Sequence, residues 1–196
     1  MEKTTITIPS SFTRLIREIG KLVDKLVEYR FRFLLVISGS DPIKLSVLAA
    51  KAVNYYTKKY KSRSKSRAIR GLYVYHDEFP DALKLKETFE KKTSSENLVE
   101  FEYTVYERSE KYLGTTVQVL VMDLTRDLKP NDVGRLVGIV EGGGLIVFLT
   151  PPWINWDTYK TIFKETLTVP QYPEPRHIFI TWFKKKLLEH DGISIY

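Results

Sequence analysis

The sequence predicts an α/β fold, with a mostly parallel sheet of about five strands and helices on both faces. Segments of strand length alternate along the chain with segments of helical periodicity, as in repeated βαβ units. Two of the strands, in residues 31–38 and 117–124, are almost continuously apolar, which is typical of strands covered on both faces. The chain has 196 residues, 43% of them hydrophobic, and no linker, so one domain is expected.

The first part of the chain supplies a helix, a buried strand and a second helix. Residues 1–30 are expected to form an N-terminal strand and helix, because apolar residues recur at helical spacing after Pro9 and Ser10. After the strand at 31–38, Asp41 offers an N-cap and Pro42 a first helical position. The buried face of the second helix is predicted to contain Leu45, Leu48, Ala49, Ala52, Val53 and Tyr56.

The rest of the chain continues the alternation. Strands are expected over residues 71–76, 98–106, 117–124 and 145–150, and a helix over 80–92. Pro130 is expected to open a helix carrying Val133, Leu136, Val137 and Val140, which Gly142–Gly144 would end. Two more helices fit residues 155–167 and 175–190, the latter with Ile178, Phe179, Trp182, Phe183 and Leu187 along one side. Two of the three tryptophans, Trp156 and Trp182, are therefore expected to pack in the core.

The strand, glycine turn and helix at residues 36–53 have the outline of a nucleotide-binding unit. A phosphate-binding loop needs a second glycine and a Gly-Lys pair, but only Ser40, Asp41 and Pro42 follow Gly39. Asp123, at the end of an apolar strand, resembles a magnesium-binding acid, yet apolar strands that end in aspartate are common in α/β folds. We therefore expect a Rossmann-like or degenerate P-loop-like domain without a phosphate-binding loop.

Other catalytic chemistry has little support in the residue composition. There is no cysteine, and His76, His177 and His190 are far apart, without metal-ligand spacing. No Ser-His-Asp set or carboxylate pair can be assembled, so we assign no catalytic residue and no metal ligand. The sequence contains neither a signal peptide nor an apolar run of membrane-spanning length, so a cytoplasmic protein without membrane contact is expected.

Positive charge is concentrated in one short segment. The net charge is +7, and residues 58–70 contain seven cations and no acid, so the segment accounts for the whole excess. A solvated loop is one interpretation, and contact with nucleic-acid phosphates is the other, which we favour because the cations lack acids within the segment. The predicted nucleic-acid-binding residues of this basic loop are Lys58, Lys59, Lys61, Arg63, Lys65, Arg67 and Arg70.

Residues 112–149 resemble the N-terminal domain of the RNA cytidine acetyltransferases, a family of tRNA(Met)-acetylating and eukaryotic rRNA-acetylating enzymes. The similar features are Leu113-Gly114-Thr115, the strand "VMDL", Pro130-Asn131 and the run Glu141-Gly142-Gly143-Gly144-Leu145. The helix around "RHIFITWFKKKLL" is also similar, and the resemblance covers most of residues 30–190.

The resemblance implies a longer parent enzyme, in which an ATP-dependent helicase-like module and an acetyl-CoA-dependent acetyltransferase module follow this domain. Together they form N4-acetylcytidine in tRNA or rRNA, with ATP, magnesium and acetyl-CoA as cofactors. The loops that define those modules are absent from residues 1–196, which we therefore expect to be one N-terminal accessory domain with no cofactor of its own.

Two functions remain open from the sequence. The domain could be a noncatalytic part of an RNA (tRNA) cytidine N4-acetyltransferase that contacts RNA and packs against the helicase-like module. It could instead be a purely structural or protein-interaction domain with a degenerate nucleotide-binding fold. A stand-alone enzyme ranks third.

Overall fold

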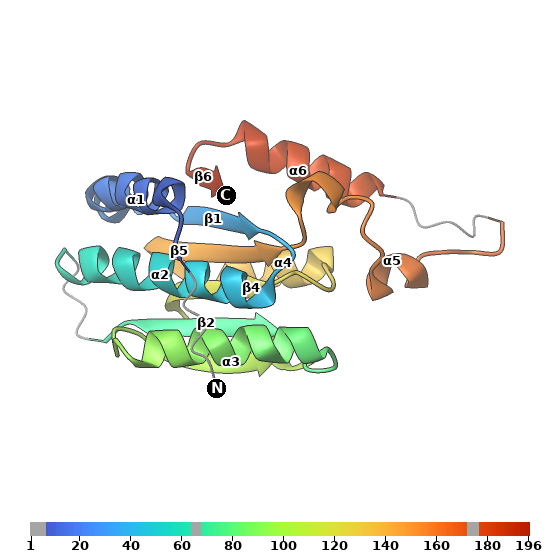
Figure 1. Cartoon of the computed structure of the whole chain (residues 1–196), viewed down its shortest axis with the longest axis horizontal. Helices are drawn as coiled ribbons and strands as arrows, with labels where there is room; N and C mark the ends of the chain where they lie inside the picture. The colour runs from blue at the N-terminus through green and yellow to red at the C-terminus, as the bar shows by residue number, and fades with distance from the viewer. Residues whose placement is uncertain (1–6, 64–67, 172–176) are drawn as a thin grey trace.

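A computed structural model describes residues 7–63, 68–171 and 177–196, and its centre is a six-stranded sheet (Figure 1). All strands are parallel, in the order β3-β2-β4-β5-β1-β6. The predicted α/β class is confirmed, with one strand more than expected. The strands are β1 (Phe33–Ser38), β2 (Arg70–Tyr75), β3 (Glu100–Val105), β4 (Val117–Asp123), β5 (Val140–Thr150) and β6 (Ile193–Ile195).

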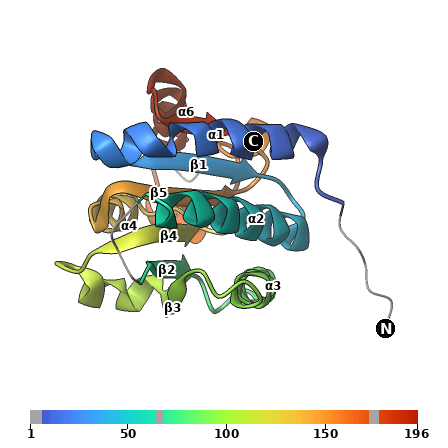
Figure 2. The same cartoon turned by 90° about the vertical axis from the view of Figure 1, so that its left-hand side faces the viewer.

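Helices cover both faces of the sheet. One face, here called the α2 face, is covered by α1 (Ser10–Glu28), α2 (Pro42–Lys61) and α3 (Pro80–Ser94), and α2 lies between the other two (Figures 1 and 2). The opposite face, here called the α4 face, is covered by η1 (Tyr106–Tyr112), α4 (Pro130–Val137) and α6 (Ile178–Glu189). Two short elements, η2 (Trp153–Asn155) and α5 (Ile162–Thr166), lie between β5 and α6.

Alternate residues of the strands fill a separate apolar core on each face. Val119 and Val121 of β4 pack on the α2 face, whereas Leu120 and Met122 pack on the α4 face. All seven residues of β4 are buried, as expected for a parallel strand covered on both sides. This burial explains why the apolar run at 117–124 was a reliable signal.

The predicted start of α2 is confirmed. Asp41 Oδ1 accepts hydrogen bonds from the backbone N–H groups of Ile43 at 2.9 Å and Lys44 at 3.2 Å, and Pro42 is the first helical residue. The aspartate thus satisfies two donors that a helix N-terminus leaves free.

The prediction that Gly142–Gly144 end a helix is wrong. These glycines belong to β5, and α4 ends earlier, at Val137. The reason is close backbone approach from distant segments. A Cβ atom on Gly142 would lie 2.6 Å from the carbonyl oxygen of Arg30, and one on Gly144 would lie 2.7 Å from that of Gln118. Glycine is required there because only it leaves room for these neighbouring chains.

Other differences lie near the chain ends. Residues 155–167 do not form one helix but contain the end of η2 and the short α5, and β6 was missed because it has only three residues. Trp156 is buried as expected, whereas Trp182 is 52% exposed, because α6 lies near the sheet edge and buries only Ile180 and Leu187. Of the expected N-terminal strand, residues 1–6 lie outside the described residues, and 7–9 form no strand.

Candidate nucleic-acid interface

The predicted basic loop is partly helical. Lys58, Lys59 and Lys61 occupy the last turn of α2, Arg63 follows the helix, and Arg70 begins β2. Lys65 and Arg67 lie outside the described residues. These cations lie at the end of the sheet where the strands begin, since α2 runs back from the end of β1 to the start of β2 (Figure 1).

Two tyrosines explain why α2 continues into the basic segment. Tyr56 and Tyr60 are buried, and their rings stack 6.4 Å apart on the side of the helix that faces the sheet. The Tyr56 hydroxyl donates to the carbonyl oxygen of Gly143 at 2.7 Å, and the Tyr60 hydroxyl donates to the carboxylate of Glu141. These contacts hold the end of α2 against the start of β5, which leaves the lysines of the last turn facing solvent.

Acids from distant segments pair with three of the predicted cations. Lys58 pairs with Glu96, Arg63 with Asp24 at 2.8 Å, and Arg70 with Glu102 at 3.6 Å. The absence of acids within the segment therefore does not mean that its cations are unpaired. All three pairs are solvent-exposed, so each contributes little to stability. Each cation can therefore exchange its carboxylate partner for another anion.

The structure adds cations from α1 to this surface. Between α1 and α2 lies a hollow of about 530 Å³, here called the basic groove. A Cβ atom on Gly20 would lie 2.5 Å from the Tyr55 ring, so the glycine permits the two helices to approach closely. The cations that line the groove are Arg17, Lys21, Lys59 and Arg63.

The charge of the basic groove is predominantly positive. Lys21 pairs with Glu18 at 2.7 Å and Arg63 with Asp24, whereas Arg17 and Lys59 form no ion pair with any residue that the structure describes. Four cations and one carboxylate, that of Asp24, thus line the groove, and Glu18 pairs with Lys21 from outside the lining. A concave surface with excess guanidinium and ammonium groups attracts phosphates and fixes their position. Arg17 and Lys21 were missed because they join the cluster only through the packing of α1 on α2.

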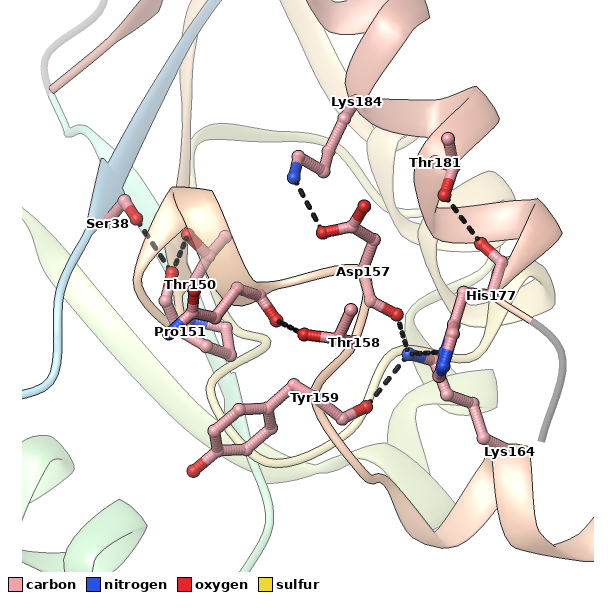
Figure 3. A network of polar contacts seen from close by, with 11 residues as sticks. Ser38, Thr150, Pro151, Asp157, Thr158, Tyr159, Lys164, His177, Thr181 and Lys184 are labelled. Atoms are coloured by element: carbon pink, nitrogen blue, oxygen red, sulfur yellow. Dashed lines mark hydrogen bonds and ion pairs between the residues drawn. The ribbon is translucent and has the colours of Figure 1, made fainter. Parts of the chain in front are cut away.

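At the opposite end of the sheet, where nucleotides bind in many α/β proteins, the hydroxyl groups that end β1 and β5 are engaged internally. Ser38 and Thr150, which end β1 and β5, both donate to the carbonyl oxygen of Pro151, at 2.7 and 3.1 Å (Figure 3). With Asp41 already capping α2, the strand ends here offer few free donors for phosphate.

A buried lysine organises the segment that follows β5. The Lys164 ammonium donates to the carbonyl oxygens of Asp157 at 2.6 Å and Tyr159 at 2.8 Å and lies 3.2 Å from His177 Nδ1 (Figure 3). Burial lowers the pKa of Lys164, and the hydrogen bond from Lys184 lowers the pKa of Asp157. This network ties α5 to the start of α6, so its polar groups are explained by local structure.

Asp123, at the end of β4, is completely buried. Its Oδ1 accepts hydrogen bonds from the backbone and hydroxyl of Thr125, at 3.0 and 2.6 Å, whereas its Oδ2 has no hydrogen-bond partner among the described residues. Burial is the main cause that raises the pKa of this carboxyl group. The described parts of the chain contain no group of three or more histidine and carboxylate side chains placed to hold a metal ion.

No helix in residues 7–63, 68–171 or 177–196 is long and apolar enough to cross a membrane.

Comparison with known proteins places the chain in a family. The family model described as "tRNA(Met) cytidine acetyltransferase TmcA, N-terminal" matches residues 3–196. A tRNA(Met) cytidine acetyltransferase of Thermofilum pendens is 36% identical over 181 residues, which cover 91% of this chain and 22% of that protein. Relatives of the same name from Methanopyrus kandleri and Pyrococcus furiosus are 42% and 39% identical over 49% and 46% of this chain, and over 12% and 11% of their own lengths.

The chain thus spans only a small part of the curated relatives that it matches. The match covers nearly the whole of this sequence, and it includes the segment 112–149 on which the resemblance was based. This chain belongs to the family of N-terminal domains of the tRNA(Met) cytidine acetyltransferases.

Proposed function

We propose that the chain is the noncatalytic N-terminal domain of a cytoplasmic, ATP-dependent RNA (tRNA) cytidine N4-acetyltransferase, and that it holds RNA through the basic groove. The observation that carries the proposal is the gathering of Arg17, Lys21, Lys59 and Arg63 along one hollow between α1 and α2. The names of the relatives, which specify tRNA(Met), supply the class of nucleic acid. In this proposal the parent's other modules bind ATP, magnesium and acetyl-CoA and carry out the acetylation.

The contacts give different roles to the cations. Arg17 and Lys59, without an ion pair among the described residues, would meet phosphates directly. Lys58, Arg63 and Arg70 would exchange an exposed carboxylate partner for a phosphate, at little cost because exposed pairs are weak. Such contacts orient RNA without reading its sequence, so base preference at the groove should be slight.

A second candidate function is that of a structural domain that packs on the helicase-like module of its parent chain. An apolar hollow of about 450 Å³ between α4 and α6 favours it, with Phe179, Trp182 and Leu187 in its lining. Ile178 and Leu188, each 68% exposed, extend the apolar surface of α6. The two functions are compatible, since the hollow lies on the α4 face and the basic groove on the α2 face.

RNA titration at several salt concentrations tests the first function. If about four groove cations meet phosphates, the slope of log affinity against log salt should be near −3 for single-stranded RNA, at ~0.7 per contact. Replacing Arg17, Lys21, Lys59 and Arg63 with serine should remove most of that slope and leave the melting temperature nearly unchanged.

A matched control replaces four exposed lysines away from the groove, namely Lys44, Lys84, Lys91 and Lys111. It makes the same change in net charge, so it separates a local site from general attraction. Equal loss in both variants, or no binding of RNA by the unaltered chain at low salt, would leave the structural function as the better account.

A further inference from the structure

We propose that Tyr29 and Phe31, just after α1, form a stacking platform for unpaired bases of RNA. The proposal rests on RNA binding in the basic groove and adds the part of the site that contacts bases. The two rings are stacked, with centroids 6.0 Å apart and planes at 24°. Both residues are exposed, Tyr29 by 59% and Phe31 by 62%, so the stacked pair presents much of its surface to solvent and to a ligand.

The end of α1 builds this arrangement through its backbone. Tyr29 is the C-cap residue and donates its N–H to Lys25, Arg30 adopts a left-handed conformation with φ 57°, and the N–H of Phe31 donates to the carbonyl oxygen of Leu26 at 2.9 Å. This is the Schellman arrangement, in which glycine is the usual left-handed residue. Here arginine takes that costly conformation, so a cation stands between the two aromatic residues in the sequence.

The platform borders a hollow of about 560 Å³, whose lining includes Leu22, Lys25, Leu26 and Phe33. Arg32 also lines it and is anchored by a hydrogen bond from its Nε to the carbonyl oxygen of Val140. The one acid in the lining that the structure describes is Asp191. The lining thus holds two cations, Lys25 and Arg32, against this one acid, and the excess of positive charge suits the aromatic surface to a polyanion.

The platform and the basic groove lie at the same end of the molecule. A Cβ atom on Gly143 would lie 3.2 Å from Val27 of α1 and 3.4 Å from the Tyr60 ring of α2, so the ends of the two helices meet at this glycine. Asp24, the partner of Arg63 in the groove, precedes Tyr29 by about 7 to 8 Å along the helix axis and by about 140° around it, so the groove and the platform lie on different sides of α1.

A strand that reaches both must pass over the end of α1, which is about 10 to 12 Å wide with its side chains, or about three steps of a stacked strand at ~3.4 Å each. A strand with phosphates in the groove can therefore place a base on the platform.

Aromatic side chains beside a basic groove are the usual device for binding single-stranded nucleic acid, because every base has a face that can stack. Duplex RNA keeps its bases stacked within the helix and cannot use such a platform. The ligand class is therefore RNA with unpaired nucleotides, and a protein partner at this surface is the competing possibility that the experiment must exclude.

The test measures the affinity of the 196-residue chain for an unpaired adenosine oligonucleotide and for an RNA duplex of the same length. Replacing Tyr29 and Phe31 with serine should weaken binding of the unpaired RNA about tenfold or more, and leave its salt slope and the duplex affinity unchanged. Quenching of 2-aminopurine placed in the oligonucleotide should be lost in the same variant. Tyr29→Phe should bind as the unaltered chain does.

Controls separate this inference from the proposed function. Tyr29→Ser alone leaves Phe31 in place against α1 and guards against misfolding, and Ile154→Ser removes an 82% exposed apolar side chain elsewhere. If the groove variant loses affinity while the Tyr29 and Phe31 variants bind unpaired RNA normally, the platform is disproved and the groove stands. Equal weakening of unpaired and duplex RNA by the platform variants would also disprove it. If the unaltered chain binds no RNA, both proposals fail.

Discussion

The hydroxyl of Tyr56 donates a hydrogen bond to the carbonyl oxygen of Gly143 at 2.7 Å, across the interface between α2 and β5. Gly143 has φ 89°, a conformation that side chains other than glycine rarely adopt. The pair thus joins a buried helix residue to a backbone position that favours glycine. It fixes the end of α2 against β5, and with it the position of the groove cations Lys59 and Arg63.

Loss of this hydrogen bond should destabilise the domain. Tyr56→Phe leaves the buried carbonyl oxygen of Gly143 without its donor, so the free energy of unfolding should fall by about 1 to 2 kcal/mol. Urea denaturation measures the change. Tyr55→Phe is the control, because the Tyr55 side chain is only partly buried; an equal loss in both variants would contradict the assigned role of the Tyr56 hydroxyl.

Removing the charge of Asp123 should stabilise the domain at neutral pH. Burial raises the pKa of Asp123, so the folded state favours the protonated carboxyl group, and stability falls as the pH rises through the folded-state pKa. Asp123→Asn keeps an acceptor for Thr125 and removes the buried charge, so the free energy of unfolding should rise by about 1 kcal/mol.

The gain from Asp123→Asn should shrink as the pH is lowered, because the wild-type carboxyl group then becomes protonated. Denaturation of both proteins across the acidic range measures this, with exposed Asp77→Asn as a control. A gain that stays constant with pH, or a marked loss of stability, would show that the carboxylate has a favourable partner in solution.

Alkaline pH should unfold the protein through its buried tyrosines. Burial raises the pKa of Tyr103 and Tyr112 to about 12 and shifts Tyr56, Tyr73 and Tyr106 in the same direction. A raised pKa favours the protonated phenol in the folded state, so the contribution to stability is complete below pH 10 and is lost as the pH rises through about 12.

The lowered pKa of Lys164 has the opposite effect, because it makes the folded state more stable as the pH rises. Lys164 is one group, however, against five tyrosines. Urea midpoints measured between about pH 9 and pH 11.5 should therefore decrease, with tyrosinate absorbance rising in step with unfolding. Midpoints that do not change over this range would contradict the prediction.

Tight ATP binding by this chain is not expected. The turn from Gly39 to Lys44 lacks the second glycine and the lysine of a phosphate-binding loop, and Asp41 already accepts two of the backbone donors of α2. Calorimetry with ATP and magnesium should therefore detect no binding of micromolar order, ~−8 kcal/mol. A dissociation constant in that range would show that the carboxyl end of the sheet binds nucleotide by other means.

Sequence patterns predicted the elements whose signals are local. The buried strand at 117–124 and the cap of α2 at Asp41 follow from residues next to one another in the chain. Gly142 was misplaced because the neighbour that demands a glycine there, Arg30, is far away in sequence. Arg17 and Lys21 were missed for the same reason, since only the packing of α1 on α2 brings them to the basic segment.

The pairing order of the sheet has a consequence for how the protein is made. Phe33 of β1 pairs with Leu145 of β5, and Leu34 pairs with Ile193 of β6, so β1 has no partner until distant parts of the chain have been synthesised. β2, β3 and β4 pair among themselves and can assemble earlier. Of the six strands, apolar β1 is thus synthesised first but paired last. This order should make folding slow, and it should leave β1 accessible to chaperones during translation.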